Sequence, residues 1–296
     1  MGNILTKQFY RQRKDFEDSC AGRDSVLTFP EGVRCSTDIA YADDGIKAHM
    51  LDIYRPEDSQ EKILPVIINV HGGGLIIGNK EFNRYFCALL CKKGFLVYSI
   101  EYRLIPDCLI YDQIADVFMA MDYIKERLAA DGGDSSHVYM AGDSGGACLI
   151  TYANAIQNST NIARAANVTP SGLRINALGL ISGMFYTSRF DKIGLFLPKY
   201  LYGRDYKKTS FAKYVNPENR ELLNSLAPVW LVTSHNDFLR RYTTDFEKAL
   251  TRAEREHELV VFPKNKKLTH AFSVFEPFLS ESSAVIDMMV EYLRKF

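Results

Sequence analysis

Short runs of β-branched and aliphatic residues alternate along most of the chain with longer segments in which apolar residues recur every three or four positions. The runs predict strands at residues 66–70, 95–100, 138–141, 175–182, 228–234 and 259–262. The periodic segments predict helices at residues 82–92, 114–128, 146–157 and 282–294. Continuous apolar strands that alternate with helices are typical of parallel sheets covered on both faces. The pattern therefore predicts an α/β fold with a mostly parallel central sheet and helices on both faces.

Other stretches depart from this alternation. A helix is expected near residues 6–18, and residues 36–54 contain two short strands separated by an Asp-Asp-Gly turn. Residues 183–214 carry nine aromatic side chains, and seven Lys or Arg against two Asp. An aromatic insertion after a strand end lies at the carboxyl edge of the sheet, where α/β proteins bind ligands. We interpret it as half of a cap over that edge; the alternative is a surface excursion with a small core of its own.

The composition excludes several classes of protein. The 296 residues include 36 basic and 36 acidic side chains, and this balance argues against nucleic acid as a partner. No apolar run approaches the roughly 18 residues of a membrane-spanning helix, and the charged N-terminal residues do not resemble a signal peptide. Six scattered cysteines are too few for a disulfide scaffold and form no metal-binding pattern. We therefore expect a cytoplasmic protein with no nucleic-acid or membrane partner.

The run Gly-Asp-Ser-Gly-Gly at residues 142–146 directly follows one predicted strand and opens a predicted helix. This is the context of a nucleophile elbow, in which a sharp turn projects a serine hydroxyl out of the sheet. The turn requires glycine at positions 142 and 146, because a side chain there would meet neighbouring backbone. The helix N-terminus behind the serine adds positive partial charge where an oxyanion would form. Ser144 is therefore the candidate nucleophile.

A second glycine-rich run, His-Gly-Gly-Gly at residues 71–74, comes immediately after another predicted strand. Consecutive glycines expose backbone N–H groups to a ligand, as an oxyanion hole requires. A phosphate-binding loop would need Gly-Lys-Ser or Gly-Lys-Thr after its glycines, whereas Leu75 follows here. We interpret His71 as a residue that orients this loop through hydrogen bonds rather than as a catalytic base.

A serine nucleophile also needs a base and an acid that orients the base. In enzymes with a nucleophile elbow the chain order is serine, then acid, then histidine, with the last two after successive late strands. Asp237 follows the strand at residues 228–234, and His270 follows the last predicted strand. His235 is the rival base, but it precedes Asp237 and breaks that order. We assign Ser144, Asp237 and His270 as the catalytic triad.

Together these motifs resemble the hormone-sensitive-lipase-like family of α/β-hydrolases. The likeness runs from about residue 39 to the C-terminus, and it also rests on Tyr-Arg-Leu-Ile-Pro-Asp at residues 102–107 and on Asp-Phe-Leu at residues 237–239. The family usually has Gly-Asp-Ser-Ala-Gly at the elbow, Asp-Pro-Leu at the acid and His-Gly-Phe at the base. Gly145, Phe238 and Ala271 are therefore departures, and none of them removes a reacting atom.

The resemblance implies an α/β-hydrolase fold with an oxyanion hole made by the backbone N–H groups of Gly73, Gly74 and Gly145. It also implies a helical cap built from residues 1–35 and 183–214, over a catalytic domain made of residues 36–182 and 215–296. Within the inserted part of the cap, we expect three aromatic residues to line the substrate pocket: Phe185, Tyr186 and Phe190.

The sequence thus predicts a carboxylic ester hydrolase of the serine type, acting through an acyl-enzyme on short- to medium-chain acyl or acetyl esters. No metal or other cofactor is implied, and the expected partner is the small-molecule ester, bound by a monomer or homodimer. An amidase or formamidase on the same scaffold would use the same groups, so the sequence does not separate it from an esterase. A non-catalytic small-molecule receptor is the third hypothesis, and the presence of all three triad residues argues against it.

Overall fold

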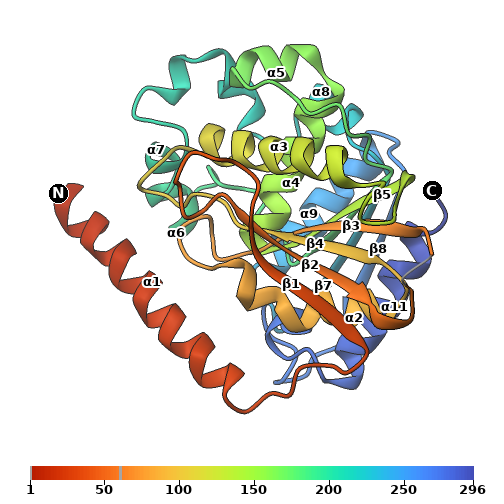
Figure 1. The fold of residues 1–296 in the computed structure, drawn as a ribbon. Coiled ribbons are helices and arrows are strands. Elements are labelled where there is room, and N and C mark those ends of the chain that lie inside the picture. The colour runs from red at the N-terminus through yellow and green to blue at the C-terminus, as the bar shows by residue number, and fades with distance from the viewer. Residues whose placement is uncertain (1, 60–61) are drawn as a thin grey trace.

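The computed structural model describes residues 2–59 and 62–296; residue 1, at the start of the expected N-terminal cap segment, and residues 60–61 lie outside that description. One eight-stranded sheet runs through the molecule in the order β1-β2-β4-β3-β5-β6-β7-β8 (Figure 1). Its strands are β1 (Val33–Ala40), β2 (Met50–Pro56), β3 (Leu64–Val70), β4 (Leu96–Ile100), β5 (Gly133–Asp143), β6 (Ala177–Ile181), β7 (Val229–Ser234) and β8 (His257–Phe262).

Helices connect and cover these strands. The α-helices are α1 (Gly2–Asp24), α2 (Arg84–Lys92), α3 (Ile110–Arg127), α4 (Ser144–Asn158), α5 (Thr160–Ala166), α6 (Lys192–Phe196), α7 (Pro198–Leu201), α8 (Arg220–Asn224), α9 (Arg240–Arg252), α10 (Phe272–Phe275) and α11 (Ser280–Leu293). Short 3-10 helices are η1 (Glu57–Ser59), η2 (Lys80–Asn83), η3 (Tyr206–Lys208) and η4 (Ser210–Tyr214).

The sheet is buried on both faces, which explains why most residues of its central strands are apolar. Along β3, Val66 and Ile68 belong to a core shared with α3, α4 and α9, whereas Ile67 belongs to a second core shared with α2 and α11. Successive side chains of a strand point to opposite faces, so one strand supplies both cores. Figure 1 shows α3 and α4 above the sheet and α2 and α11 below it. The prediction of a covered α/β sheet is confirmed.

Parallel pairing determines where the functional loops meet. The pairs β3–β4, β3–β5, β5–β6, β6–β7 and β7–β8 are parallel, while β1–β2 and β2–β4 are antiparallel. The carboxyl ends of β3, β5, β7 and β8 therefore lie along one edge of the sheet. The glycine run, the elbow, the predicted acid and the predicted base follow these four strands.

The inserted segment divides into two parts with different roles. Its later aromatic residues form a satellite core: Phe211 is fully buried against Tyr111 of α3, Tyr152 of α4 and Tyr214. Its earlier part, around α6, lies over the edge of the sheet that carries the glycine run and the elbow. The later part of the insertion thus packs on α3 and α4, and the earlier part contributes Ile193 and Leu197 to the surroundings of Ser144.

Candidate active site

Ser144 occupies a strained turn between β5 and α4. Its backbone φ is +49°, a conformation that costs a non-glycine residue roughly 1–2 kcal/mol. A Cβ on Gly146 would lie 2.1 Å from the Val70 carbonyl oxygen, and one on Gly142 would lie 2.9 Å from the same atom. The elbow therefore packs directly on the end of β3, and its two outer glycines are required by that close approach.

The three predicted triad residues lie within hydrogen-bond distance of one another. His270 Nε2 is 2.9 Å from Ser144 Oγ, and His270 Nδ1 is 2.7 Å from Asp237 Oδ1. Because a carboxylate only accepts hydrogen bonds, Nδ1 carries the proton and Nε2 is left to accept one from the serine hydroxyl. This is the geometry that a serine nucleophile, a histidine base and an orienting acid require.

Asp237 is held as an anion at the end of β7. Its side chain is fully buried, and it accepts further hydrogen bonds from the Thr233 hydroxyl, at 2.8 Å, and the Leu239 amide, at 2.8 Å. Burial opposes ionisation of Asp237, but the hydrogen bond and charge of His270 and the other donors outweigh burial and lower its pKa. The acid is therefore ionised across the neutral pH range.

The rival base, His235, does not approach Ser144. Its Nδ1 accepts a hydrogen bond from Arg240 at 2.8 Å, and the residue lines a separate surface hollow beside α9 and β8. His235 comes before Asp237 in the chain, and its side chain lies beside Arg240 and not beside Ser144.

The glycine run lies beside the nucleophile. Gly73 and Gly74 line the same cavity as Ser144 and His270, and both have positive φ angles, 102° and 61°. A Cβ on Gly145 would lie 2.9 Å from the Gly74 nitrogen, so the elbow and the glycine run are in backbone contact. Within residues 2–59 and 62–296, the N–H groups of Gly73 and Gly74 donate to no protein acceptor. These free donors are what an oxyanion hole requires.

Asp143, a residue that the sequence analysis did not single out, connects the elbow to the glycine run. Its Oδ1 accepts hydrogen bonds from the Gly72 amide at 3.0 Å and from Asn83 Nδ2 at 2.9 Å. The carboxyl is completely buried, and this burial raises its pKa against the opposing effects of Asn83 and His71. Its position directly before Ser144 in the elbow motif was the sequence feature that could have identified it.

His71 lies under the glycine run and does not contact Ser144. Its Nε2 is 2.9 Å from Glu101 Oε1, its Nδ1 is 2.8 Å from the Gly72 carbonyl oxygen, and its ring stacks on Tyr102. Burial opposes protonation, but the Glu101 charge, its hydrogen bond and the Gly72 carbonyl outweigh it and raise the pKa of His71. These contacts suit the predicted orienting role.

A cavity of about 330 Å³ opens above the triad. Its walls are apolar side chains from α1, the glycine run, η2, the insertion and the loops after β7 and β8: Phe16, Ile76, Ile77, Phe82, Met184, Ile193, Leu197, Phe238, Leu239 and Phe275. Among the described residues that line it, Asp143 and His270 are the only ones with acidic or basic side chains. The site is therefore suited to an uncharged ligand.

The predicted pocket residues Phe185, Tyr186 and Phe190 are not part of this cavity, and that prediction is corrected here. Phe185 stacks on Phe246 of α9 at 4.2 Å, and the Tyr186 hydroxyl donates to Glu218. Phe190 points outward and is 91% exposed. Phe185 and Tyr186 pack against α9 and are therefore not available to line the cavity. Ile193 and Leu197, further along the insertion, line it instead.

Helix α1, which belongs to the segment expected to form part of the cap, contributes Phe16, a cavity residue that the sequence analysis did not single out. Phe16 lines the cavity and contacts Phe82, while Phe9 packs edge-on against Tyr200 of α7. Arg13 fixes the helix by donating to Asp107 at 2.7 Å and to the Ile76 carbonyl at 2.8 Å. The spacing of Phe9 and Phe16, two helical turns apart, was the signal for this buried face.

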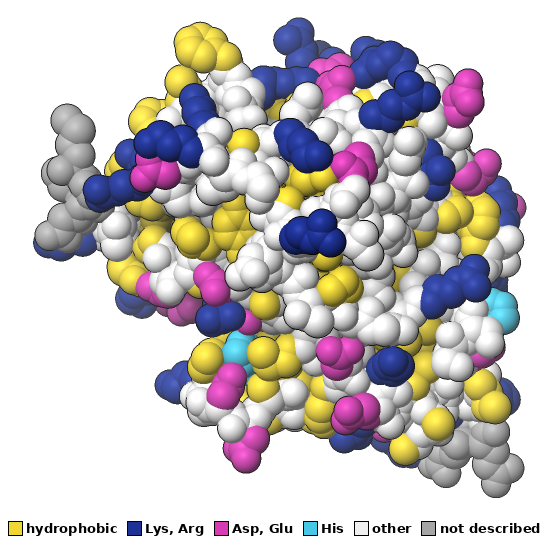
Figure 2. Space-filling model, turned by 90° about the horizontal axis from the view of Figure 1, so that it is seen from above, with side chains coloured by type: hydrophobic (Ala, Val, Ile, Leu, Met, Phe, Trp, Pro, Cys, Tyr) yellow, Lys and Arg dark blue, Asp and Glu magenta, His cyan; other side chains and the backbone are white. Residues whose placement is uncertain are grey.

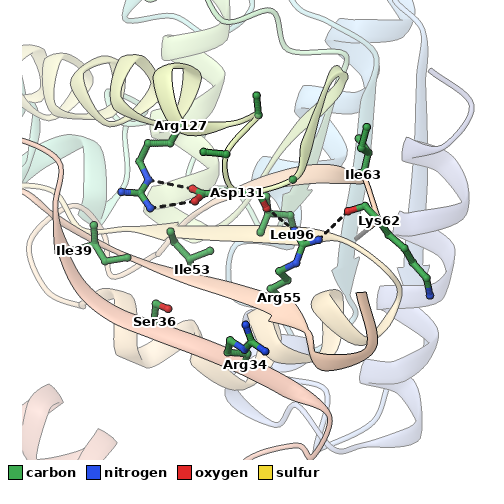
Figure 3. Close-up of a pocket in the computed structure, with 13 residues that line it drawn as sticks. Arg34, Ser36, Ile39, Ile53, Arg55, Lys62, Ile63, Leu96, Arg127 and Asp131 are labelled. Atoms are coloured by element: carbon green, nitrogen blue, oxygen red, sulfur yellow. Dashed lines mark hydrogen bonds and ion pairs between the residues drawn. The ribbon is translucent and has the colours of Figure 1, made fainter. Parts of the chain in front are cut away.

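A larger hollow of about 640 Å³ lies at the other end of the sheet, beside β1 and β2 (Figure 3). Its rim carries Arg34, Arg55 and Arg127, and its floor includes Ile53. Arg127 is paired with Asp131, as the dashed lines show. Among its described lining residues Ser36 is the only hydroxyl, and no histidine lies there to act as its base, so this hollow is a weaker candidate than the cavity above Ser144.

Neither a metal-binding cluster nor a membrane-spanning helix is found in the described part of the chain. No group of three or more His, Cys, Asp or Glu side chains there is arranged to hold a metal ion. No helix in that part has both the length and the apolar character to cross a bilayer.

Several known proteins with similar sequences are named as esterases. A probable isoprenylcysteine alpha-carbonyl methylesterase of Oryza sativa subsp. japonica is 29% identical over 184 residues, which are 58% of this chain and 44% of that protein. Esterase LipQ of Mycobacterium tuberculosis is 32% identical over 120 residues, 40% of this chain and 28% of that protein. The matched region thus spans less than half the length of either relative.

Solved structures with the same fold are also esterases. Esterase B from Lactobacillus rhamnosis superposes with a TM-score of 0.92 at 21% identity, covering 100% of this chain and 96% of that one. A bacterial heroin esterase gives a TM-score of 0.72 at 22% identity, with coverages of 97% and 91%. A family model described as alpha/beta hydrolase fold matches residues 67–273. Since that match covers most of the sequence, the chain belongs to the α/β-hydrolase fold family, as its hormone-sensitive-lipase-like motifs indicated.

Proposed function

We propose that this protein is a serine hydrolase that cleaves neutral, short- to medium-chain acyl or acetyl esters. One observation carries the proposal: Ser144, His270 and Asp237 form a continuous hydrogen-bonded chain, with contacts of 2.9 and 2.7 Å, at the floor of an apolar cavity. The esterase names of its relatives agree with this chemistry.

In the proposed reaction, Ser144 Oγ attacks the ester carbonyl carbon while His270 Nε2 takes the serine proton. Asp237 keeps the proton of Nδ1 in place and stabilises the imidazolium that forms. His270 then returns the proton to the leaving alcohol, and an acyl-enzyme remains. A water molecule, activated by His270 in the same way, releases the acid and restores the serine.

The negative charge that develops on the carbonyl oxygen needs donors already in position. The N–H groups of Gly73, Gly74 and Gly145 are the proposed donors, the first two being free of protein acceptors in the described residues. Removing one such donor from a serine hydrolase costs roughly 10²- to 10³-fold in kcat. The Asp143 contact with the Gly72 amide would hold the donors in place.

The cavity supports the proposed substrate class. Its volume of about 330 Å³ is at the small end of the range for ligand pockets, which is roughly 300–1,000 Å³. A charged substituent inside it would be buried without a partner, which is strongly unfavourable. Both features favour neutral esters with a short or medium acyl chain.

The proposal is tested with p-nitrophenyl acetate, butyrate, octanoate and palmitate and with the Ser144→Ala variant. Wild type is expected to show an acylation burst and turnover on the shorter esters, and little on palmitate. Ser144→Ala should lose about 10⁵- to 10⁶-fold in kcat while remaining folded. If folded wild type hydrolyses none of these esters, the proposal is overturned in favour of a small-molecule receptor.

The amidase alternative requires a separate comparison. An aryl ester and an anilide with the same acyl group differ only in the leaving group. The esterase proposal expects the ester to have the higher kcat/KM by orders of magnitude. A preference for the amide would instead assign the protein to the amidases or formamidases.

A further inference from the structure

The outer surface of the cap carries large apolar side chains that the cavity does not use. Phe190 is 91% exposed, and Leu195 and Phe196 are each 56% exposed. Figure 2, which views the molecule from above, shows apolar side chains that project from the surface among Lys and Arg. Exposed apolar groups that gather in this way mark an interaction site more often than an ordinary solvated surface.

The segment formed by α6 and α7 is apolar on two sides. Ile193 and Leu197, four residues apart, face inward and line the cavity above Ser144. The opposite side carries four exposed residues at helical spacing: Lys192, Leu195, Phe196 and Lys199. A helix at a protein surface normally has a polar outer side. Exposure to water therefore does not explain why Leu195 and Phe196 occupy this outer side.

Phe190 is presented outward by a loop that is fixed on both sides of it. Arg189 pairs with Asp245 of α9 at 2.9 Å, and Asp191 accepts a hydrogen bond from the Tyr242 hydroxyl at 2.6 Å. A Cβ on Gly194 would lie 1.9 Å from the Arg189 carbonyl oxygen, so the loop also packs closely on α6. The exposure of Phe190 is therefore a property of a well-anchored loop.

The charges around these side chains narrow the choice of partner. Lys192 and Lys199 flank Leu195 and Phe196, and neither lysine forms an ion pair in the described part of the chain. The nearby Asp191 is occupied by the N-terminal amides of α6 and by Tyr242. A symmetric contact between two copies would bring like charges together, whereas a surface of lipid phosphates would neutralise them.

We propose that Phe190, Lys192, Leu195, Phe196 and Lys199, here called the docking face, bind the surface of an anionic lipid bilayer. Aromatic and aliphatic side chains enter the headgroup boundary, and the two lysines meet lipid phosphates. Phe238 and Phe275, which are 74% and 37% exposed, line the cavity together with Ile193 and Leu197 from the inner side of the same segment. Docking itself does not depend on the proposed ester hydrolysis; only the delivery of lipid-dissolved esters to Ser144 rests on it.

The test measures co-sedimentation with vesicles of phosphatidylcholine and phosphatidylglycerol in equal parts, and with phosphatidylcholine alone. Wild type should bind the mixed vesicles more tightly, and added salt should weaken the binding. The triple variant Phe190→Ser, Leu195→Ser, Phe196→Ser should lose at least about tenfold in partitioning. The pair Lys192→Gln, Lys199→Gln should lose roughly fivefold per charge on mixed vesicles, with little change on neutral ones.

Matched controls separate docking from other effects. Val26→Ser with Ile63→Ser removes side chains of similar exposure, 78% and 75%, from other surfaces and should leave binding unchanged. Ser144→Ala should also bind as wild type does, so a failure of the esterase proposal would not affect this result. Circular dichroism verifies that each variant is folded.

Three outcomes would overturn the proposal. Wild type that fails to sediment with mixed vesicles at low salt would exclude lipid docking. A triple variant that binds like wild type would show that another surface is responsible. A wild-type dimer that the triple variant converts to monomer, with no vesicle binding by either, would assign the docking face to contact between copies.

Discussion

The floor and the roof of the cavity are built on different principles. The floor consists of turns that directly follow parallel strands, and its polar groups are tied together by short hydrogen bonds, as in the series Ser144, His270 and Asp237. The roof consists of side chains such as Phe16 and Ile193, which come from helices outside the sheet and touch the ligand space only through apolar contacts. In the proposed function, the groups that react thus come from loops at the sheet edge, and the side chains that would select the substrate come from the helices above it.

This difference predicts two classes of mutational effect. A change in the floor should lower kcat for every substrate, because it disturbs groups that act in the transition state. A change in the roof should alter which ester is preferred, because it alters only binding volume. The following variants test the distinction, in decreasing order of expected effect.

Asp237→Asn is expected to have the largest effect. The amide keeps the shape of the side chain but no longer holds His270 in the productive tautomer, and the equivalent change in a serine protease costs about 10⁴-fold in kcat. The measurement is kcat on p-nitrophenyl acetate for folded variant and wild type. A loss smaller than tenfold would remove Asp237 from the triad.

Gly145→Ala should be the next most harmful, although alanine is the usual residue of the family at this position. The added Cβ would lie 2.8 Å from the Leu75 nitrogen and 2.9 Å from the Gly74 nitrogen, and backbone must shift to admit it. Displacing one oxyanion donor predicts a 10²- to 10³-fold loss in kcat with little change in KM.

A matched change at Gly22, where a Cβ meets nothing within 4 Å, controls for the methyl group alone. Gly22→Ala should leave kcat unchanged. Equal activity of Gly145→Ala and wild type would mean that the contact between the elbow and the glycine run is looser than described.

The contact between His71 and Glu101 should make the unfolding free energy of the protein depend on pH. The raised pKa of His71 means that its charged pair with Glu101 stabilises the folded state fully below the ordinary histidine pKa of 6.5, and that this stabilisation is lost as pH rises through the folded-state pKa. Glu101→Gln removes the pair and should cost about 3 kcal/mol at pH 6. Urea unfolding should show the gap to wild type shrinking above pH 6.5, and a constant gap would contradict this assignment.

Phe16→Ala tests the roof. Removing the ring enlarges the cavity without touching the triad, so the preferred acyl chain should lengthen, with roughly tenfold changes in relative kcat/KM. The measurement compares acetate, butyrate and octanoate esters. Tyr10→Ala removes a hydroxyl that donates to Asp107 but does not line the cavity, so it controls for loosening of α1. An equal loss of kcat/KM for all three esters would mean that Phe16 affects catalysis in general and not the choice of acyl chain.

Ala271→Gly should have the smallest effect and the opposite sign. Ala271 is completely buried at a backbone φ of +48°, which glycine adopts without strain. Relief of that strain, less the greater entropy of glycine in the unfolded chain, predicts a gain of about 1 kcal/mol in unfolding free energy. Urea unfolding measures it, and a loss of stability would mean that the methyl group contributes more by packing.

The sequence predicted the floor better than the roof for a physical reason. Ser144 and the glycine run are marked by local turn chemistry, and strand order alone then selects Asp237 over any earlier acid and His270 over His235. Which residues form the roof depends on the tertiary contacts of each aromatic side chain, and these contacts are not marked in the local sequence. Phe185 finds Phe246 on α9, a helix that was not predicted although Tyr242, Phe246 and Leu250 have helical spacing.

The ends of helices were also predicted less well than their presence. The helix expected at residues 114–128 begins at Ile110, where Asp112 accepts a hydrogen bond from the Leu109 amide. The helix expected near residues 6–18 extends over Gly2–Asp24. Both extensions depend on caps and tertiary contacts that apolar periodicity does not encode.

The attachment of α1 has a consequence for synthesis of the protein. The helix precedes every partner that it contacts: Ile76 and Asp107 for Arg13, and Tyr200 for Phe9. It therefore leaves the ribosome well before the residues that will hold it. Once residue 107 has also emerged, Arg13 can bind Asp107, but the partner of Phe9 is not yet available. One wall of the cavity is made among the first residues of this chain and is completed only after some two hundred have followed.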